Sequence, residues 1–249
     1  MVSDFSQVDI NQLKVVVLTG AGISAESGLK TFRDNNGLRE NHQVQDVATP
    51  EGFAANSALV YRFYNQRRQQ LLSSELRPNE AHFALAKLES ALGANFTLIT
   101  QNVDNLHRRA GSKNVLHMHG SLLSAKCLVS ERTSEIKGHI LDIDSRCVCC
   151  HPSNGLRPDI VWFGEIPKYM SEIEQKLSQA DVFISIGTSG TVYPAAGFVT
   201  LAKDNGALTI ELNLEPSSGQ SEFHRGYYGT ATSVVSSFVE TFLEGQSFD

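Results

Sequence analysis

The stretch that decides the fold is VVVLTGAGISAESG, residues 15–28. Its first four residues form an apolar run with three β-branched valines, which is typical of a buried strand. A glycine-rich turn follows directly, and a helix is expected to start after it. A turn of this kind points backbone N–H groups at an anion and leaves room for a phosphate to approach. The chain is therefore predicted to bind a nucleotide or a dinucleotide.

Short apolar runs alternate with helical patterns along the rest of the chain. Several of these runs are apolar almost throughout, as expected of strands that are covered on both faces. The alternation predicts an α/β fold with a Rossmann-like, doubly wound parallel sheet. Strands are expected at residues 14–19, 96–100, 114–118, 160–163, 182–186 and 208–212, and helices at 58–73, 80–92, 171–179, 195–205 and 234–243.

Two segments interrupt this alternation. Residues 35–75 are largely polar and contain one long basic helix, and residues 121–157 contain all four cysteines but little periodicity. We expect the two segments to form a small inserted domain with a helical part and a zinc-binding module. The Rossmann-like domain is then assembled from residues 1–34, 76–120 and 158–249.

Composition restricts the classes of partner. The 249-residue chain carries a net charge of −6, so it lacks the basic footprint that nucleic acid requires. The N-terminus does not have the pattern of a signal peptide, and no apolar run approaches the roughly 20 residues that span a bilayer. These features predict a cytoplasmic protein with neither nucleic-acid nor membrane partners. They leave the oligomeric state open, and a monomer is compatible with them.

The glycines alone do not identify the ligand. Gly20-x-Gly22-x-x-Ala25 fits the loose dinucleotide fingerprint, which is usually followed about 20 residues later by an acidic residue at the end of the next strand. Residues 35–60 show no strand that could carry one, so an ordinary dehydrogenase half is disfavoured. A tight turn without a ligand is the other alternative.

Polar residues follow two of the expected strands, at the edge where parallel sheets bind ligands. Asn102 and Asp104 come just after the strand at 96–100, and an amide with a nearby carboxylate can hold a carboxamide. An Asx turn is the alternative for this pair. His119 directly follows the next expected strand, at 114–118, and His117 lies near the end of that strand. Because strand alternation places both on one face, spacing does not choose between them.

The cysteines point to a metal. In a reducing compartment a cluster of this kind indicates metal binding rather than disulfides. Cys147 and Cys150 have the spacing of a structural zinc pair, and Cys127 begins a second pair in which Ser130 occupies the other position. Cys149 and His151 are the alternatives for the remaining ligand, and free cysteines in a loop are the alternative without a metal.

Six motifs in this order resemble the sirtuins, a family of NAD-dependent protein deacylases, and the short N-terminus and the YNQRR helix resemble its bacterial branch. The motifs are GAGISAESGLKTFRD (20–34), TQNVDNLHRRAG (100–111), HMHG (117–120), RPDIVWFGE (157–165), GTS (187–189) and NLE (213–215). The resemblance covers nearly the whole chain. It implies that acylated lysines of proteins are the substrates, that NAD is the co-substrate, and that one zinc ion is structural. The products would be free lysine, nicotinamide and O-acyl-ADP-ribose.

The resemblance also implies roles for individual residues. His119, directly before the glycine, would be the general base, and Phe32 would screen the nicotinamide from water. Asn102 would orient the ribose, and Asp104 with the backbone of Val103 would bind the nicotinamide amide. The expected NAD-binding residues are Gly20, Ala21, Gly22, Ile23, Ser24, Glu26, Ser27, Thr31, Phe32, Arg33, Gln101, Asn102, Val103, Asp104, Gly187, Thr188, Ser189, Asn213, Leu214, Glu215 and Ala231.

Two further features concern the acylated substrate. By resemblance, Val161 and Phe163 in the strand expected at 160–163 and the loop at residues 190–193 would hold an extended peptide between them through main-chain hydrogen bonds. A plain core strand is the alternative for residues 160–163, and Trp162 would then be a core residue. Tyr64 and Arg67 share one face of the basic helix, where a phenol and a guanidinium can clamp a carboxylate. A solvated basic face is the alternative, but with the resemblance the pair implies removal of succinyl and malonyl groups besides acetyl.

Two other functions compete with deacylation. A protein ADP-ribosyltransferase would pass the same sugar to an amino-acid side chain, and an NAD-sensing module would have no activity. The intact His119, Asn102 and Asp104 disfavour the second.

Overall fold

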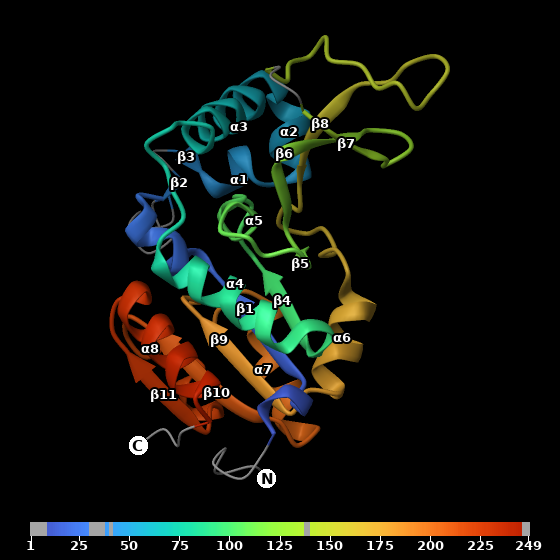
Figure 1. Ribbon diagram of the computed structural model, residues 1–249. Helices are drawn as coiled ribbons and strands as arrows, with labels where there is room; N and C mark the ends of the chain where they lie inside the picture. The colour runs from blue at the N-terminus through green and yellow to red at the C-terminus, as the bar shows by residue number, and fades with distance from the viewer. Residues whose placement is uncertain (1–8, 30–37, 40–41, 137–139, 246–249) are drawn as a thin grey trace.

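A computed structural model describes residues 9–29, 38–39, 42–136 and 140–245. Thr31, Phe32 and Arg33, which the sequence places at the cofactor, lie outside these ranges. The described chain is built around a six-stranded parallel sheet in the order β11-β10-β9-β1-β4-β5 (Figure 1). Its strands are β1 (Val15–Thr19), β4 (Phe96–Thr100), β5 (Val115–His117), β9 (Val182–Ile186), β10 (Leu208–Asn213) and β11 (Arg225–Tyr228).

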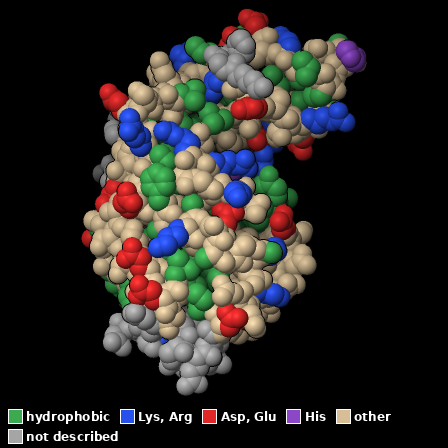
Figure 2. Space-filling view, viewed as in Figure 1, with side chains coloured by type: hydrophobic (Ala, Val, Ile, Leu, Met, Phe, Trp, Pro, Cys, Tyr) green, Lys and Arg blue, Asp and Glu red, His purple; other side chains and the backbone are tan. Residues whose placement is uncertain are grey.

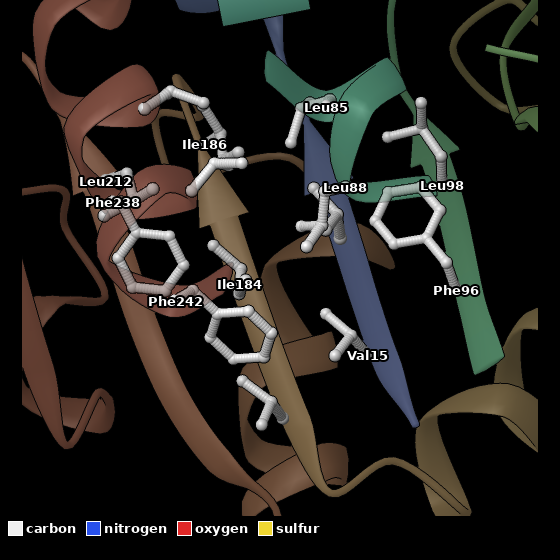
Figure 3. Close-up of a cluster of buried hydrophobic side chains, with 14 of the residues drawn as sticks. Val15, Leu85, Leu88, Phe96, Leu98, Ile184, Ile186, Leu212, Phe238 and Phe242 are labelled. Atoms are coloured by element: carbon white, nitrogen blue, oxygen red, sulfur yellow. The ribbon is translucent and has the colours of Figure 1, made fainter. Parts of the chain in front are cut away.

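Helices cover both faces of this sheet, because both faces are apolar. On one face α4 (Glu80–Leu92) and α8 (Ala231–Leu243) pack on alternate strand residues, and Phe238 and Phe242 lie against Ile184 (Figure 3). On the other face α6 (Met170–Ser178) and α7 (Phe198–Asp204) cover the remaining alternate residues. The predicted α/β fold with a doubly wound parallel sheet is confirmed.

The strand order reverses at β1. From β1 the chain builds outward through β4 and β5 on one side, and then through β9, β10 and β11 on the other. In open parallel sheets, ligands bind at the carboxyl ends of the strands beside such a reversal. The fold therefore places a binding site next to the glycine-rich segment that follows β1.

A second sheet has three strands in the order β7-β6-β8. It lies beside α1, α2 and α3, at the end of the molecule away from the six-stranded sheet (Figure 1). The side chains of α3 pack against Leu122, Ile160 and Trp162 in one cluster. The two interrupting segments are thus in contact, although the proposed domain boundaries stay a prediction. The elements are α1 (Val44–Val47), α2 (Pro50–Ala55), α3 (Ser57–Leu71), β6 (Gly120–Cys127), β7 (Thr133–Glu135), β8 (Leu156–Ile160) and a hairpin of β2 (Leu38–Arg39) and β3 (His42–Gln43).

The expected strand at 160–163 is wrong. The strand in this region is β8, which ends at Ile160 and pairs antiparallel with β6. Beyond it the backbone turns, because the N–H of Trp162 bonds to the side chain of Glu165 while its carbonyl accepts the N–H of Glu165. β8 was not predicted because it contains the polar residues Arg157 and Asp159, which are buried in the structure but give no apolar pattern in the sequence.

The other predicted elements agree within a few residues, and those at 96–100, 182–186 and 80–92 agree at both ends. Residues 195–205 divide into a 3₁₀ turn (Ala195–Gly197) and α7. β6 was not expected, because the shift in its pairing with β8 between Ser121 and Ala125 breaks the alternation of buried side chains. β11 was also not expected, since it is only four residues long.

Short helical turns complete the described chain. They are η1 (Ile10–Gln12), η2 (Ala21–Ser27), η4 (Gly93–Asn95), α5 (Leu106–Arg109) and η6 (Gln220–Glu222). Within the described ranges, no helix combines the length and the apolar character needed to cross a bilayer.

Candidate functional site

Strand register brings the candidate residues together. Thr19 at the end of β1 is level with Thr100 of β4 and Ile186 of β9, and Thr100 is level with His117 of β5. The residues that follow these strands therefore meet at one edge of the sheet. They surround a cavity of about 570 Å³, which is large enough for a sizeable ligand.

Most of the predicted site residues line this cavity. They are Gly20, Ala21, Gly22, Ser24, Glu26, Arg67, Gln101, Asn102, Val103, Asp104, His119, Val161, Phe163, Gly187, Thr188, Ser189, Asn213, Leu214 and Ala231. The lining residues come from the part that carries β6–β8 and from the part with the six-stranded sheet. The outline of the molecule is indented between its upper and lower parts (Figure 2).

Four predicted residues are not among the lining residues. Ile23 is fully buried in the core under α4, so only its backbone is near the cavity. The hydroxyl of Ser27 accepts a hydrogen bond from Nδ2 of Asn79 at 3.0 Å. Tyr64 is buried, and its hydroxyl accepts a hydrogen bond from Nε1 of Trp162, which does line the cavity. Glu215 directly follows Leu214, a lining residue. The roles predicted for these four side chains stay predictions.

Glycines let two loops interlock at the strand reversal. The N–H groups of Gly20 and Gly22 donate to the carbonyls of Ile186 and Gly187, both at 2.9 Å. A Cβ on Gly22 would lie 2.7 Å from the Cα of Gly187, and one on Gly187 would lie 2.5 Å from the nitrogen of Ile23. Gly187 also has φ +62°, which favours glycine. The loops after β1 and β9 thus approach each other only because both carry glycine.

A buried polar network forms the back wall. The Ser24 hydroxyl donates to Oδ2 of Asp104 at 3.1 Å and accepts from Nδ2 of Asn102 at 3.2 Å. Nδ2 of Asn102 also donates to the Gly20 carbonyl at 3.0 Å, and the N–H of Leu106 donates to Oδ1 of Asp104 at 3.0 Å. Burial raises the pKa of Asp104, and the bonds from Leu106 and Ser24 oppose that shift. The network thus ties the glycine loop to the segment after β4.

Two buried histidines support this wall and were missed by sequence reasoning. Nε2 of His107 lies 2.9 Å from Oγ1 of Thr19, and Nε2 of His82 lies 3.4 Å from the Ser24 hydroxyl. Burial lowers the pKa of His82 to about 4 and that of His107 well below its ordinary value. Both are therefore neutral supports near pH 7. In the sequence, His82 is a single histidine within the helix expected at 80–92, and His107 lies in a segment with no expected element. Neither position reveals a partner 58 or 88 residues away.

The structure separates the two histidines that spacing left equivalent. His119 lines the cavity, and its Nδ1 lies 3.1 Å from the Gln101 carbonyl. Because a carbonyl only accepts, Nδ1 carries the proton, which leaves the lone pair of Nε2 as the basic site. His117 is not among the lining residues, its Nδ1 lies 3.3 Å from the Asn102 carbonyl, and burial lowers its pKa.

The far end of the cavity is built by β10 and the start of α8. Nδ2 of Asn213 donates to the Thr188 carbonyl at 2.8 Å, which fixes the loop after β9. The carboxylate of Glu26 accepts from the N–H and the hydroxyl of Thr232 at 2.8 and 2.7 Å. Glu26 therefore links the glycine-rich segment to the first turn of α8 beside Ala231.

All four cysteines meet in the insert. Their Sγ atoms lie within 4.8 Å of one another, and Cys127 and Cys150 are 3.8 Å apart. Tetrahedral zinc with Zn–S bonds of about 2.3 Å places its sulfurs about 3.8 Å apart, so the set fits a structural zinc. Hydrogen bonds from the Ser130 side chain and backbone lower the pKa of Cys127 to about 6, which favours the thiolate that zinc binds.

The cluster contains a fourth cysteine besides the three that the sequence favoured. Cys149 is this fourth member, and its Sγ lies 3.1 Å from the Ser130 hydroxyl, so the structure places Ser130 beside the cysteine cluster. His151 is not part of the group. Because none of the cysteines lines the cavity, the zinc would hold the insert together at a place apart from the cavity.

Elemental analysis should find one zinc per chain. We expect Cys147→Ser to lower the zinc content to less than half and to reduce Tm, because a three-cysteine site is incomplete. Ser153→Ala, at an exposed position in the same loop, is the matched control and should keep both values. An unchanged Tm in Cys147→Ser would argue against a structural metal.

Comparisons with known proteins agree with this geometry. Residues 20–194 match the model of the Sir2 family. An NAD-dependent protein deacylase of Pasteurella multocida is 59% identical over 232 residues, which cover 93% of this chain and 99% of the relative. A mutant Sir2 homologue in complex with ADP-ribose superposes with a TM-score of 0.84 at 36% identity, and a Sir2–p53 peptide–NAD⁺ complex superposes at 0.73 and 29%; each alignment covers 94% of both chains. The chain belongs to the Sir2 family.

Proposed function

We propose that the chain is an NAD-dependent protein deacylase that removes acyl groups from lysine side chains. The observation that carries the proposal is the wall formed by His119 and the Ser24–Asn102–Asp104 network, at the reversal of a parallel sheet. The Sir2 relative described above bears the name of such a deacylase. Its substrates would be proteins that carry acylated lysines.

The cavity wall suits NAD along its length. When bound, NAD supplies a bond between ribose and nicotinamide whose cleavage makes the sugar carbon electrophilic toward the acyl oxygen. Asp104 and the backbone of Val103 would hold the carboxamide, and Asn102 would orient the ribose. The glycine loop would accept the phosphates, and the segments around Asn213 and Ala231 would hold the adenosine.

His119 would act as the general base. Its Nε2 lone pair would take the proton of a ribose hydroxyl, which then attacks the acyl carbon. The carbonyl of Gln101 would keep the imidazole in the required tautomer through Nδ1, and would stabilise the charge that develops on the ring. Apolar lining from Leu122, Ile160 and Phe163 would exclude water, which would otherwise capture the sugar carbon.

The peptide would bind beside the segment after β8. The N–H of Val161 donates to the His119 carbonyl and that of Phe163 to the Ala48 carbonyl, both at 2.9 Å. Because these two N–H groups already donate hydrogen bonds within the protein, an extended peptide would form its hydrogen bonds with the carbonyl groups of this segment. The segment is thereby coupled to the backbone of the proposed base.

The acyl group would enter on the side of α3. Arg67 lines the cavity there, one helical turn after Tyr64. A guanidinium at this position suits an acyl group that ends in a carboxylate, so we include succinyl and malonyl besides acetyl among the groups removed.

Mass spectrometry of peptides tests the proposal. Acetyl-lysine and succinyl-lysine peptides are incubated with the protein, with and without NAD. We expect deacylation, nicotinamide and O-acyl-ADP-ribose only when NAD is present. A folded preparation that consumes no NAD with either peptide would contradict the proposal. Label from NAD that stays on a target protein would instead support ADP-ribosyl transfer.

A further inference from the structure

We propose that Trp162 is a positioning residue that tunes the site for acyl groups ending in a carboxylate, by holding the Tyr64 hydroxyl with its indole N–H. The inference rests on the proposed deacylase function and assigns a residue that determines its acyl preference.

The indole of Trp162 joins two parts of the site. Trp162 lines the cavity although only 2% of it is exposed. Its Nε1 donates to the Tyr64 hydroxyl oxygen at 3.0 Å, across 98 residues of sequence. A buried indole N–H needs a hydrogen-bond acceptor. Here the acceptor is the hydroxyl of Tyr64, which lies on α3, the helix that also carries Arg67. The bond thus connects the proposed peptide-binding segment to the proposed acyl pocket.

The ring of Trp162 is held firmly in its plane. The guanidinium carbon of Arg157 lies 3.7 Å from the ring centroid. Arg157 also donates to both carboxylate oxygens of Glu165, at 2.8 and 2.6 Å, and the same carboxylate accepts the backbone N–H of Trp162 at 2.8 Å. The side chain and the backbone of Trp162 are therefore fixed by one ion pair, so the direction of its N–H is set before a ligand arrives.

This bond changes what the phenol of Tyr64 can do. A hydroxyl that accepts a hydrogen bond from an N–H becomes a stronger donor through its own proton, because bonds in a chain polarise one another. An acyl carboxylate held by Arg67 would accept that proton in a hydrogen bond, which completes the chain indole N–H, phenol O–H, carboxylate. An acetyl group has no carboxylate and cannot use the chain. Trp162 should therefore affect succinyl-lysine more than acetyl-lysine.

The first test is Trp162→Phe, which keeps an aromatic ring and removes the N–H. We compare kcat/KM for a succinyl-lysine peptide with kcat/KM for an acetyl-lysine peptide, and we expect the ratio of the two to fall about three- to tenfold. This is the effect of losing one neutral hydrogen bond, and it should arise mainly from a higher KM for the succinyl-lysine peptide. Tyr64→Phe should lower the same ratio, and the double variant should lower it no further than Tyr64→Phe alone. An unchanged ratio in Trp162→Phe, or additive losses in the double variant, would overturn the inference.

Phe53→Leu is the matched control. The Phe53 ring packs 5.3 Å from that of Trp162 but takes no part in the hydrogen bond. Its loss disturbs the wall of the pocket and should reduce both activities in proportion, so that the ratio is kept. A fall in the ratio as large as that of Trp162→Phe would show that packing, and not the N–H, sets the preference.

A second measurement does not depend on how Trp162→Phe folds. Trp162 is the only tryptophan of the chain, so intrinsic fluorescence reports on this ring alone. In the wild-type protein without NAD, succinyl-lysine peptide should change the emission more than acetyl-lysine peptide does. In Tyr64→Phe that difference should vanish, and its persistence there, or its absence in the wild type, would contradict the inference. Deacetylation that continues in the wild type would leave the proposed function intact in either case.

Discussion

Replacing His119 by glutamine is expected to lower kcat for deacylation by roughly 10²- to 10⁴-fold, the usual contribution of a general base. Glutamine has a similar reach and can still bond to the Gln101 carbonyl, but it cannot take a proton near neutral pH. Binding of NAD should persist, because the glycine loop and the Asp104 network are unchanged. Steady-state kinetics with an acetyl-lysine peptide, together with NAD binding by calorimetry, measures both quantities.

His117→Gln is the control for this variant. His117 is two residues away and bonds to the Asn102 carbonyl in the same manner, but it is not among the residues that line the cavity. We expect its kcat to stay within a few-fold of the wild type. Equal losses in the two variants would mean that the imidazoles support the fold, and that the base lies elsewhere.

Arg67→Met is expected to reduce kcat/KM for succinyl-lysine peptide about 10- to 150-fold, the range of a hydrogen bond to a charged group. Methionine keeps the apolar stem but removes the guanidinium that would pair with the acyl carboxylate. The acetyl group carries no charge, so deacetylation should change only a few-fold. Kinetics with two peptides that differ only in the acyl group give the comparison.

Arg62→Met tests whether the overall positive charge of α3, rather than the guanidinium of Arg67 itself, selects the succinyl group. Arg62 lies on the same helix but is exposed and is not among the lining residues. We expect both activities to be kept in this variant. If Arg67→Met lowered desuccinylation and deacetylation equally, the arginine would support the pocket wall and would not select the acyl group.

Much of the fold could be predicted from the sequence, because the positions of most strands and helices follow from local residue patterns. The strands at 96–100 and 182–186 are mostly apolar and buried along their whole length, as expected in a sheet that is covered on both faces. Gly20, Gly22 and Gly187 mark the points where two loops must approach within van der Waals distance. Since parallel strands end at one edge, polar residues after successive strands predicted one shared site.

The error at 160–163 shows where local pattern fails. Val161, Trp162 and Phe163 are an apolar, aromatic run that favours a strand, but their backbone N–H groups bond to His119, Glu165 and Ala48. These partners are distant or belong to a turn, and they override β-propensity. The true strand carries Arg157 and Asp159, whose burial depends on an ion pair or stacking that no local rule predicts.

The sequence by itself determined five strands of the parallel sheet and the main helices that cover it, the position of the glycine-rich turn and the set of polar groups at the strand ends. It did so because periodicity and glycine act within a few residues. Only the tertiary structure decided that His119 and not His117 lines the cavity, that Cys149 lies within the cysteine cluster, and that Trp162 bonds to Tyr64. Each of these depends on the direction of a side chain relative to a distant segment, and that direction is set by packing.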